Sequence, residues 1–258
     1  MTFNVRGARF QDGENVWPNR AALSADVIRR YAPDLIGFQE LELQNYAFYR
    51  EHLRGYEAAL GPGYNNVPPF QYPAIFWRRE RLKLRDTGGF WLSTTPGVHS
   101  AAWGTDCIRS AGWVRLALPE AGAELLHLNT HLDHISEPAR AQGATLIAER
   151  LGALWADGVP AVVTGDFNCP PGSAAHHALL AAGLEDSHAR LHGGAPVMTF
   201  HGFKGDGFQP QPHDALDRID WVLARGLRPT ACAIVTDAVP PHYPSDHYPV
   251  VTDFVLEA

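Results

Sequence analysis

The chain has 258 residues, a formal net charge of −7 at pH 7, 45% hydrophobic residues and 19% charged residues. This composition is typical of a folded globular protein and favours neither a disordered chain nor a fibrous repeat. The negative charge also disfavours a protein that grips long nucleic acid through a general basic surface, because such binding needs Lys and Arg to neutralise the phosphates.

The N-terminal residues Met1-Thr2-Phe3 predict a short apolar strand that ends at Asn4. No basic region followed by an apolar stretch is visible there, and no run reaches the roughly 20 apolar residues of a membrane span. We therefore expect a cytoplasmic protein, monomeric and without a membrane partner. Cys107, Cys169 and Cys232 are widely separated, which predicts small buried side chains rather than a disulfide framework or a metal site.

Strand and helix signals then alternate along the chain. A helical period of apolar residues covers Trp17 to Tyr31, and Asp34 to Glu40 follows as an apolar strand that ends on a carboxylate. The clearest helix is Glu137 to Trp155, with apolar residues three and four apart on one face. Segments rich in Val, Ile and aromatic residues predict further strands at 74–77, 112–118, 125–130, 161–164, 219–223, 231–235 and 250–255.

No Gly/Ser-rich or charged linker divides these elements, so the sequence predicts a single domain over residues 1–258. Two segments are rich in turn-forming residues, 61–73 and 191–216. Long loops within a compact domain are often functional. We expect these two segments to form the walls of a substrate cleft.

Glu40 stands alone as an acidic group at the end of an apolar strand. Burying an unpaired carboxylate would cost free energy. Hard cations such as Mg²⁺ or Mn²⁺ prefer oxygen ligands. One or two protein carboxylates, several waters and a substrate phosphate suffice for such an ion, so we predict a metal ligand at Glu40. The alternative is a Glu that forms a salt bridge or caps a helix in the following turn.

Asp166 and Asn168 lie two residues apart after the strand at 161–164. On an extended segment both side chains point the same way, which suits a carboxylate that accepts a proton from water and a carboxamide that fixes the water or the phosphate. An Asx-turn that closes the strand before Pro170-Pro171 uses the same residue types. From these residues alone the two interpretations are equally good.

Two histidines occupy similar positions. His131 ends the strand at 125–130, and the pair Asp246-His247 precedes the last strand. A neighbouring carboxylate can keep an imidazole protonated so that it stabilises charge on a phosphate, and Asp220 is a second carboxylate that could orient His247. The chain has 13 His, so most are bystanders, and no HExxH or HxH spacing supports zinc.

Six pieces of the sequence, taken in order, resemble the endonuclease/exonuclease/phosphatase superfamily of DNase I-like metal-dependent phosphoesterases, in a less characterised bacterial branch. They are Asn4, Glu40, the NTHL at 129–132, the GDFN at 165–168, the RIDW at 218–221 and the SDH at 245–247. The resemblance covers nearly the whole chain. It implies an α/β fold in four layers, α/β/β/α, with two mixed β-sheets packed face to face and helices outside.

The resemblance also implies roles, which agree with the chemistry of the residues. The expected metal ligands for Mg²⁺ or Mn²⁺ are Glu40, Asn4 and Asp246. The expected catalytic and supporting residues are Asp166 and Asn168 at the attacking water, and His131, His247, Asp220 and Asp246 around the phosphate. The expected substrate contacts are Arg109, Asn4 and Arg6, although a surface or salt-bridged role for Arg109 is an equally good interpretation.

We therefore expect a metal-dependent phosphoesterase in which an Asp-oriented water attacks phosphorus in line and His stabilises the phosphate. The substrate is a phosphomonoester or phosphodiester on a small molecule, or DNA or RNA within the same mechanism. The lack of a Lys/Arg run argues mildly for a small or short substrate. A second hypothesis, a catalytically silent binding module on this fold, predicts loss of site residues, whereas all six pieces are present.

Overall fold

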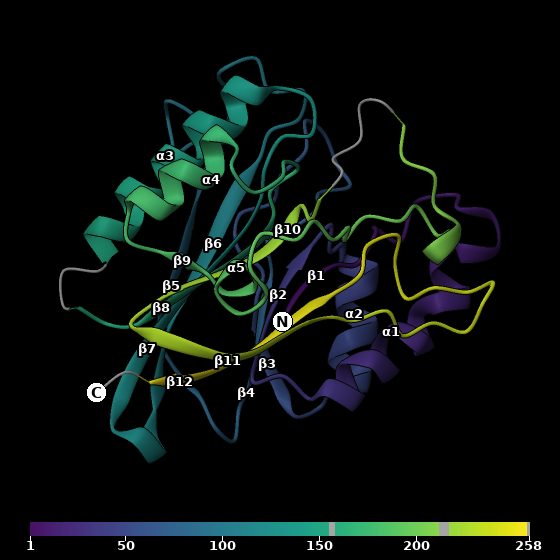
Figure 1. The fold of residues 1–258 in the computed structure, drawn as a ribbon, viewed down its shortest axis with the longest axis horizontal. Helices are drawn as coiled ribbons and strands as arrows, with labels where there is room; N and C mark the ends of the chain where they lie inside the picture. The colour runs from purple at the N-terminus through teal and green to yellow at the C-terminus, as the bar shows by residue number, and fades with distance from the viewer. Residues whose placement is uncertain (155–157, 212–216, 257–258) are drawn as a thin grey trace.

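The computed structural model describes residues 1–154, 158–211 and 217–256. Two mixed six-stranded β-sheets pack face to face, and helices cover both outer faces (Figure 1). The expected four-layer α/β/β/α sandwich is confirmed. Among the described helices, none combines the length and the apolar character needed to cross a membrane.

The first sheet has the strand order β11-β12-β1-β2-β4-β3. Its strands are β1 (Thr2–Asn4), β2 (Leu35–Gln39), β3 (Tyr56–Ala59), β4 (Ile75–Arg78), β11 (Leu227–Ile234) and β12 (Val250–Leu256). Helices α1 (Trp17–Tyr31) and α2 (Leu43–His52) cover its outer face. There Tyr49 stacks on Phe38, and Trp17 packs edge-on against Tyr49. Burial of these aromatic rings stabilises the pairing of sheet and helices.

The second sheet has the order β5-β6-β7-β8-β10-β9. Its strands are β5 (Lys83–Trp91), β6 (Ser110–Leu118), β7 (Ala123–His131), β8 (Ala161–Asp166), β9 (Glu185–Asp186) and β10 (Asp220–Arg225). Helices α3 (Glu137–Leu154) and α4 (Ala174–Ala181) cover its outer face, at the upper left of Figure 1. A short helix, α5 (Ser187–His192), follows β9, and single 3₁₀ turns are η1 (Gly13–Asn15), η2 (Pro119–Ala121) and η3 (Gly205–Gly207).

The expected helix at 17–31 is α1 residue for residue, and the expected helix at 137–155 is α3, although Trp155 lies outside the described residues. All the expected strands are present, with ends shifted by at most four residues. The sequence pattern did not predict α2, α4, α5, β3, β5 or β9. Strand β5 is an exposed edge strand that contains Lys, Arg, Asp and two Gly, residue types that are depleted in strands, so its pattern gave little signal.

The two sheets touch through a buried polar seam. A Cβ atom on Gly37 of β2 would lie 2.0 Å from Thr164 Oγ1 and 2.5 Å from Asn129 Oδ1, so only glycine fits there. Asn129 donates Nδ2 to the carbonyl of Phe38 at 2.7 Å and accepts hydrogen bonds from Gln39 Nε2 at 2.7 Å and Thr164 Oγ1 at 3.0 Å. The Asn of the NTHL piece therefore joins the sheets rather than facing the substrate.

Strand direction brings the candidate site residues to one end of the sandwich. β1 runs parallel to β2, β7 runs parallel to β8, and β10 runs antiparallel to β8 with Asp220 opposite Asp166. Three strands therefore end, and β10 begins, at the same edge, where they place Asn4, His131, Asp166 and Asp220. Glu40 follows the last residue of β2 directly.

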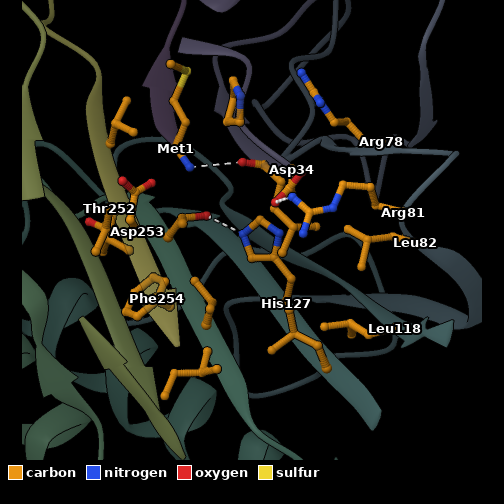
Figure 2. Close-up of a pocket in the computed structure, with 18 of the residues that line it drawn as sticks. Met1, Asp34, Arg78, Arg81, Leu82, Leu118, His127, Thr252, Asp253 and Phe254 are labelled. Carbon is orange, nitrogen blue, oxygen red and sulfur yellow. Dashed lines mark hydrogen bonds and ion pairs between the residues drawn. The ribbon is translucent and has the colours of Figure 1, made fainter. Parts of the chain in front are cut away.

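A cavity of about 720 Å³ lies at the opposite end of the sandwich, between the starts of β1, β2 and β7 and the end of β12 (Figure 2). Met1, Asp34 and Phe254 are among its lining residues. His127 also lines it, with Nε2 2.8 Å from Thr164 Oγ1, and burial lowers the pKa of His127 to about 3. None of the expected site residues lines this cavity, so it is separate from the strand ends described above.

Candidate active site

Asp166 is the centre of the candidate site. Its side chain is buried at the end of β8, and Oδ2 accepts a hydrogen bond from Asn4 Nδ2 at 2.9 Å. The same oxygen lies 3.3 Å from His131 Nε2 and 3.8 Å from His247 Nε2. Asn4 Nδ2 also reaches Glu40 Oε1 at 3.3 Å. Three residues from separate parts of the chain, Asn4, His131 and His247, thus meet around one carboxylate, and Asn4 links it to Glu40.

Burial and neighbouring charges shift the pKa values of Asp166 and His247. Burial, and then the negative charge of Asp220, raise the pKa of Asp166 to about 7. Burial opposes a charge on His247, but the carboxylates of Asp220 and Asp166 outweigh it and raise the pKa of His247 to about 10. His247 Nδ1 lies 2.9 Å from Asp220 Oδ2, the orienting contact expected from the sequence. His247 is therefore an imidazolium at neutral pH.

His131 is held in the opposite charge state. Burial, followed by the positive charges of Arg109 and His247, lowers the pKa of His131 well below its usual range. Its Nδ1 lies 3.2 Å from the hydroxyl of Tyr64. At neutral pH His131 is consequently a neutral ring that presents Nε2 to Asp166.

Glu40 is a partly exposed carboxylate held by weak donors. Gly7 N and Gln71 Nε2 each approach Oε2 at 3.3 Å, while the backbone N–H of Glu40 donates to Tyr64 Oη at 2.8 Å. In the described part of the chain no Lys, Arg or His forms an ion pair with it, and the N-cap of α2 is Glu42. The salt-bridged and helix-capping alternatives therefore find no support at Glu40.

The expectation that Asp166 and Asn168 project together from an extended segment is wrong. The strand ends at Asp166, and Asn168 takes a left-handed backbone conformation with φ 51°. Its N–H donates to Asp166 Oδ1 at 3.0 Å, which is the Asx-turn, and its Nδ2 donates to Leu132 O at 3.0 Å. The chain turns because Phe167 stacks on Trp221 in the core, with ring centroids 4.2 Å apart. The turn holds one oxygen of Asp166 and leaves the other to the site.

Asp246 lies beside this group and is buried. Its Oδ1 accepts from Ser245 Oγ at 3.1 Å, and burial followed by the charge of Glu40 raises its pKa, which the imidazolium of His247 opposes. Arg6 Nε lies 3.6 Å from Asp246 Oδ2, and the Arg6 guanidinium also binds both oxygens of Asp12 at 3.1 and 3.0 Å. Arg6 is thus already paired with two carboxylates.

Within the described residues, Arg109 has no such carboxylate partner. The residue is 6% exposed, and its Nε has no hydrogen-bond partner within the described ranges. One terminal nitrogen lies 3.3 Å from His134 Nδ1, and the guanidinium carbon lies 5.6 Å from the centre of the Tyr64 ring. No described carboxylate forms an ion pair with it, so the structure does not support the salt-bridged interpretation. Arg109 keeps donor capacity beside His131.

The sequence did not predict two residues, Tyr64 and Arg20, that contact parts of the site. Tyr64 belongs to the turn-rich segment 61–73, but nothing in the pattern distinguished it from other aromatic residues. Arg20 lies on the buried face of α1 and donates to the carbonyls of Asn15, Val5 and Pro244 at 2.8, 2.6 and 3.0 Å. A basic residue among the apolar positions of an amphipathic helix was the available signal.

The donor set fits a hard divalent cation. Asp166, Asp220 and His247 lie within 4.8 Å of one another, but the protonated His247 ring cannot ligate a cation, so the carboxylates are the available donors. Asp220 Oδ1 has no hydrogen-bond partner among the residues described. Glu40 and Asp246 add carboxylate oxygens next to this group, and Asn4 carries a carboxamide. Mg²⁺ and Mn²⁺ take such oxygen ligands, whereas thiolate ligands, typical of zinc, are absent from the cluster.

The sequence model of the Endonuclease/Exonuclease/phosphatase family matches residues 1–247. A search among curated proteins found no match. Among solved structures, a mannosyl-6-phosphatase of Bacteroides thetaiotaomicron is 28% identical with a TM-score of 0.88, and the match covers 99% of this chain and 98% of that one. An endonuclease/exonuclease/phosphatase from Bacteroides vulgatus is also 28% identical, with a TM-score of 0.87 and coverage of 99% and 97%.

The human Nocturnin catalytic domain is more distant. It is 20% identical, with a TM-score of 0.77, and the match covers 99% of this chain and 93% of that one. At this identity the likeness concerns the fold alone.

Proposed function

The chain belongs to the endonuclease/exonuclease/phosphatase family and is a hydrolase of phosphoester bonds, and on that basis we propose that it is a divalent-metal-dependent phosphatase of small phosphomonoesters. One observation carries the proposal. The single oxygen Asp166 Oδ2 is approached by Asn4, His131 and His247 together, beside the carboxylate of Glu40. A water and a phosphate bound there would meet a base, a cation and a neutral donor at once.

Glu40 would hold Mg²⁺ or Mn²⁺, with Asp246 as a further oxygen ligand. Asn4, expected from the sequence to be a ligand, instead directs Nδ2 at Glu40 while its oxygen accepts from Arg6 N, so it would position Glu40. When bound, the cation supplies charge stabilisation to the phosphate oxygens and raises the acidity of nearby water. Hard cations keep several waters of their own, so this small ligand set is sufficient. The weak hydrogen bonds at 3.3 Å around Glu40 leave its oxygens accessible to such an ion.

The other catalytic roles belong to side chains of the protein. Asp166, with its pKa raised to about 7, orients a water and takes its proton. The imidazolium of His247 stabilises negative charge on the phosphate, and Asp220 fixes that ring. Neutral His131 donates from Nε2 to a phosphate or leaving-group oxygen. Asn168 acts through the Asx-turn that fixes Asp166.

Three observations favour a small monoester over nucleic acid. The net charge of −7 does not suit a long polyanion. Arg109 brings to the site a buried guanidinium that forms no ion pair with a described carboxylate, which suits the extra negative charge of a monoester. The similar structure from Bacteroides thetaiotaomicron is named as a mannosyl-6-phosphatase, which supports a sugar phosphate as the first substrate to test.

The test compares hydrolysis of mannose 6-phosphate, p-nitrophenyl phosphate, bis(p-nitrophenyl) phosphate and a short oligonucleotide, with Mg²⁺, with Mn²⁺ and with chelator. We expect turnover of a monoester only with metal. Asp166→Asn keeps the shape of the side chain but removes the base, so kcat should fall by about 10²–10⁴. Asp253→Asn, at an exposed position on β12, serves as the control and should retain full activity.

Three results would contradict the proposal. Turnover that survives complete chelation would exclude the metal requirement, and wild-type rates in Asp166→Asn would exclude the assigned base. Faster turnover of the oligonucleotide than of any monoester would replace the phosphatase with a nuclease.

A further inference from the structure

Tyr64 lies between the proposed metal ligand and the neutral histidine, and its hydroxyl contacts both. The residue is fully buried in the segment between β3 and β4. Its Oη lies 2.8 Å from the backbone nitrogen of Glu40 and 3.2 Å from His131 Nδ1. Its ring meets the His131 ring edge-on, with centroids 5.8 Å apart.

The chemistry of these three groups fixes the proton positions. A backbone N–H can only donate, so the oxygen of Tyr64 is the acceptor in its contact with Glu40. Among the described residues, His131 Nδ1 is then the only acceptor within hydrogen-bond distance of this buried hydroxyl, so the hydroxyl proton is donated to it. An Nδ1 that accepts a hydrogen bond carries no proton in a neutral ring, so the ring proton is on Nε2.

We propose that Tyr64 is a positioning residue whose hydroxyl holds His131 in the Nε2–H tautomer, with that N–H directed at Asp166 and the phosphate. The distance of 3.3 Å between His131 Nε2 and Asp166 Oδ2 places the proton on the catalytic side of the ring. The other tautomer would present a lone pair to the Asp166 carboxylate, which would repel it. The catalytic consequence rests on the proposed phosphatase function, whereas the tautomer assignment does not.

The same hydroxyl supports Glu40. Glu40 has φ 57°, a left-handed conformation that is uncommon for a residue other than glycine, so its backbone depends on its surroundings. By accepting the Glu40 N–H, Tyr64 holds this backbone and couples it to His131. The Tyr64 side chain thus connects Glu40, the proposed metal ligand, with His131, the proposed donor to the phosphate or leaving group.

The test uses Tyr64→Phe, which retains the ring and removes only the hydroxyl. Two-bond ¹H–¹⁵N NMR spectra of the full-length protein at neutral pH distinguish the protonated and unprotonated nitrogens of His131. We expect the wild type to show Nε2–H alone and Tyr64→Phe to show a mixture or the Nδ1–H form. Monoester turnover should fall by about 10–100-fold in kcat, with little change in KM.

Tyr56→Phe is the matched control. The Tyr56 hydroxyl is also buried and donates to Pro33 O at 2.6 Å, but it lies away from the strand ends that carry the site. The control should lose similar stability while leaving the His131 spectrum and the kinetics unchanged.

The outcomes separate this inference from the proposed function. If His131 stays in the Nε2–H tautomer in Tyr64→Phe, or is in the Nδ1–H form in the wild type, the inference is overturned whatever the activity. If the tautomer changes as expected in a protein that hydrolyses no phosphoester, the positioning role stands and the proposed function fails.

Discussion

Asp166 lies between two histidines whose neighbours hold them in opposite charge states. His247 contacts Asp220 and approaches Asp166, and these carboxylates keep it protonated. His131 is buried and also faces the positive Arg109, and both lower its pKa, so it stays neutral. The same residue type therefore performs two roles, a fixed cation and a neutral donor, because its surroundings differ.

The Asp220 carboxylate sets the charge of His247, and this can be tested with Asp220→Asn. Loss of that charge removes the largest contribution that raises the pKa of His247, so the pKa should fall from about 10 by about 1–3 units. Since the imidazolium is the active form, activity is present below the pKa and lost as pH rises through it. NMR titration of His247 and rate measurements from pH 6 to 9 should show an alkaline fall in Asp220→Asn and none in the wild type.

The same shift has a consequence for stability. The pKa of His247 in the folded protein lies above its unfolded value, so its contribution to stability is fully present below about pH 6.5 and is lost as pH rises through about 10.

Asp253→Asn again serves as the control for the Asp220→Asn titration, because that exposed carboxylate is far from the His247 ring. An unchanged titration of His247 in Asp220→Asn would show that another group holds the proton.

Secondary-structure elements position the loops of the site as well as the site's side chains. Helix α1 places Arg20 so that its buried guanidinium donates to carbonyls before the Asp246-His247 pair and around Arg6. A charged group buried without a carboxylate is costly, and here the several backbone acceptors offset that cost. The helix therefore joins two loops that are distant in sequence and adjacent at the strand ends.

The contact between the two sheets depends on the absence of a side chain at Gly37. In Gly37→Ala the new methyl group would overlap Thr164 Oγ1 and Asn129 Oδ1 and force the polar seam apart. We expect a loss of about 2–4 kcal/mol in the free energy of unfolding, from overpacking together with weakened buried hydrogen bonds. Chemical denaturation monitored by tryptophan fluorescence and by circular dichroism would measure it.

Gly152→Ala is the matched control for this prediction. Gly152 lies exposed in α3, and nothing is within 4 Å of the position of its Cβ. There the substitution should stabilise the protein by about 0.5–1 kcal/mol, because alanine favours the helix. We also propose that both sheets unfold together as one domain, so the two optical signals should give coincident transitions. A neutral effect of Gly37→Ala would mean that the sheets can separate without cost.

At the scale of the whole molecule, periodicity and strand-end chemistry predicted most of the architecture. The helix at 17–31 and the strands before Glu40, His131 and Asp166 follow from apolar patterns, and the common edge of these strands brings their polar ends together. The conformation of Asn168 was not predictable, because the turn depends on Phe167 stacking against Trp221, a residue 54 positions further along the chain. Tyr64 was missed for the same reason: its role exists only through contacts with distant residues.

The charge of the whole molecule gives a last prediction about the substrate. The chain has 21 Lys and Arg against 28 Asp and Glu, so an anionic substrate approaches a molecule of like charge. For a small phosphomonoester, salt screens this long-range repulsion, and kcat/KM should change by less than about threefold between 50 and 200 mM salt. A protein that makes 6–10 phosphate contacts along nucleic acid would instead lose about 10³–10⁵ in affinity over this range.

The measurement is kcat/KM for p-nitrophenyl phosphate at constant Mg²⁺ and increasing salt, with binding of a fluorescent oligonucleotide followed under the same conditions. Weak salt dependence of turnover, together with oligonucleotide binding that is weak even at the lowest salt, agrees with a small substrate. A steep fall in oligonucleotide affinity from a tight starting value would instead require a basic surface formed locally within an acidic protein. Arg109 and the residues around it would then be the first place to look, since its guanidinium is buried at the site without a described carboxylate partner.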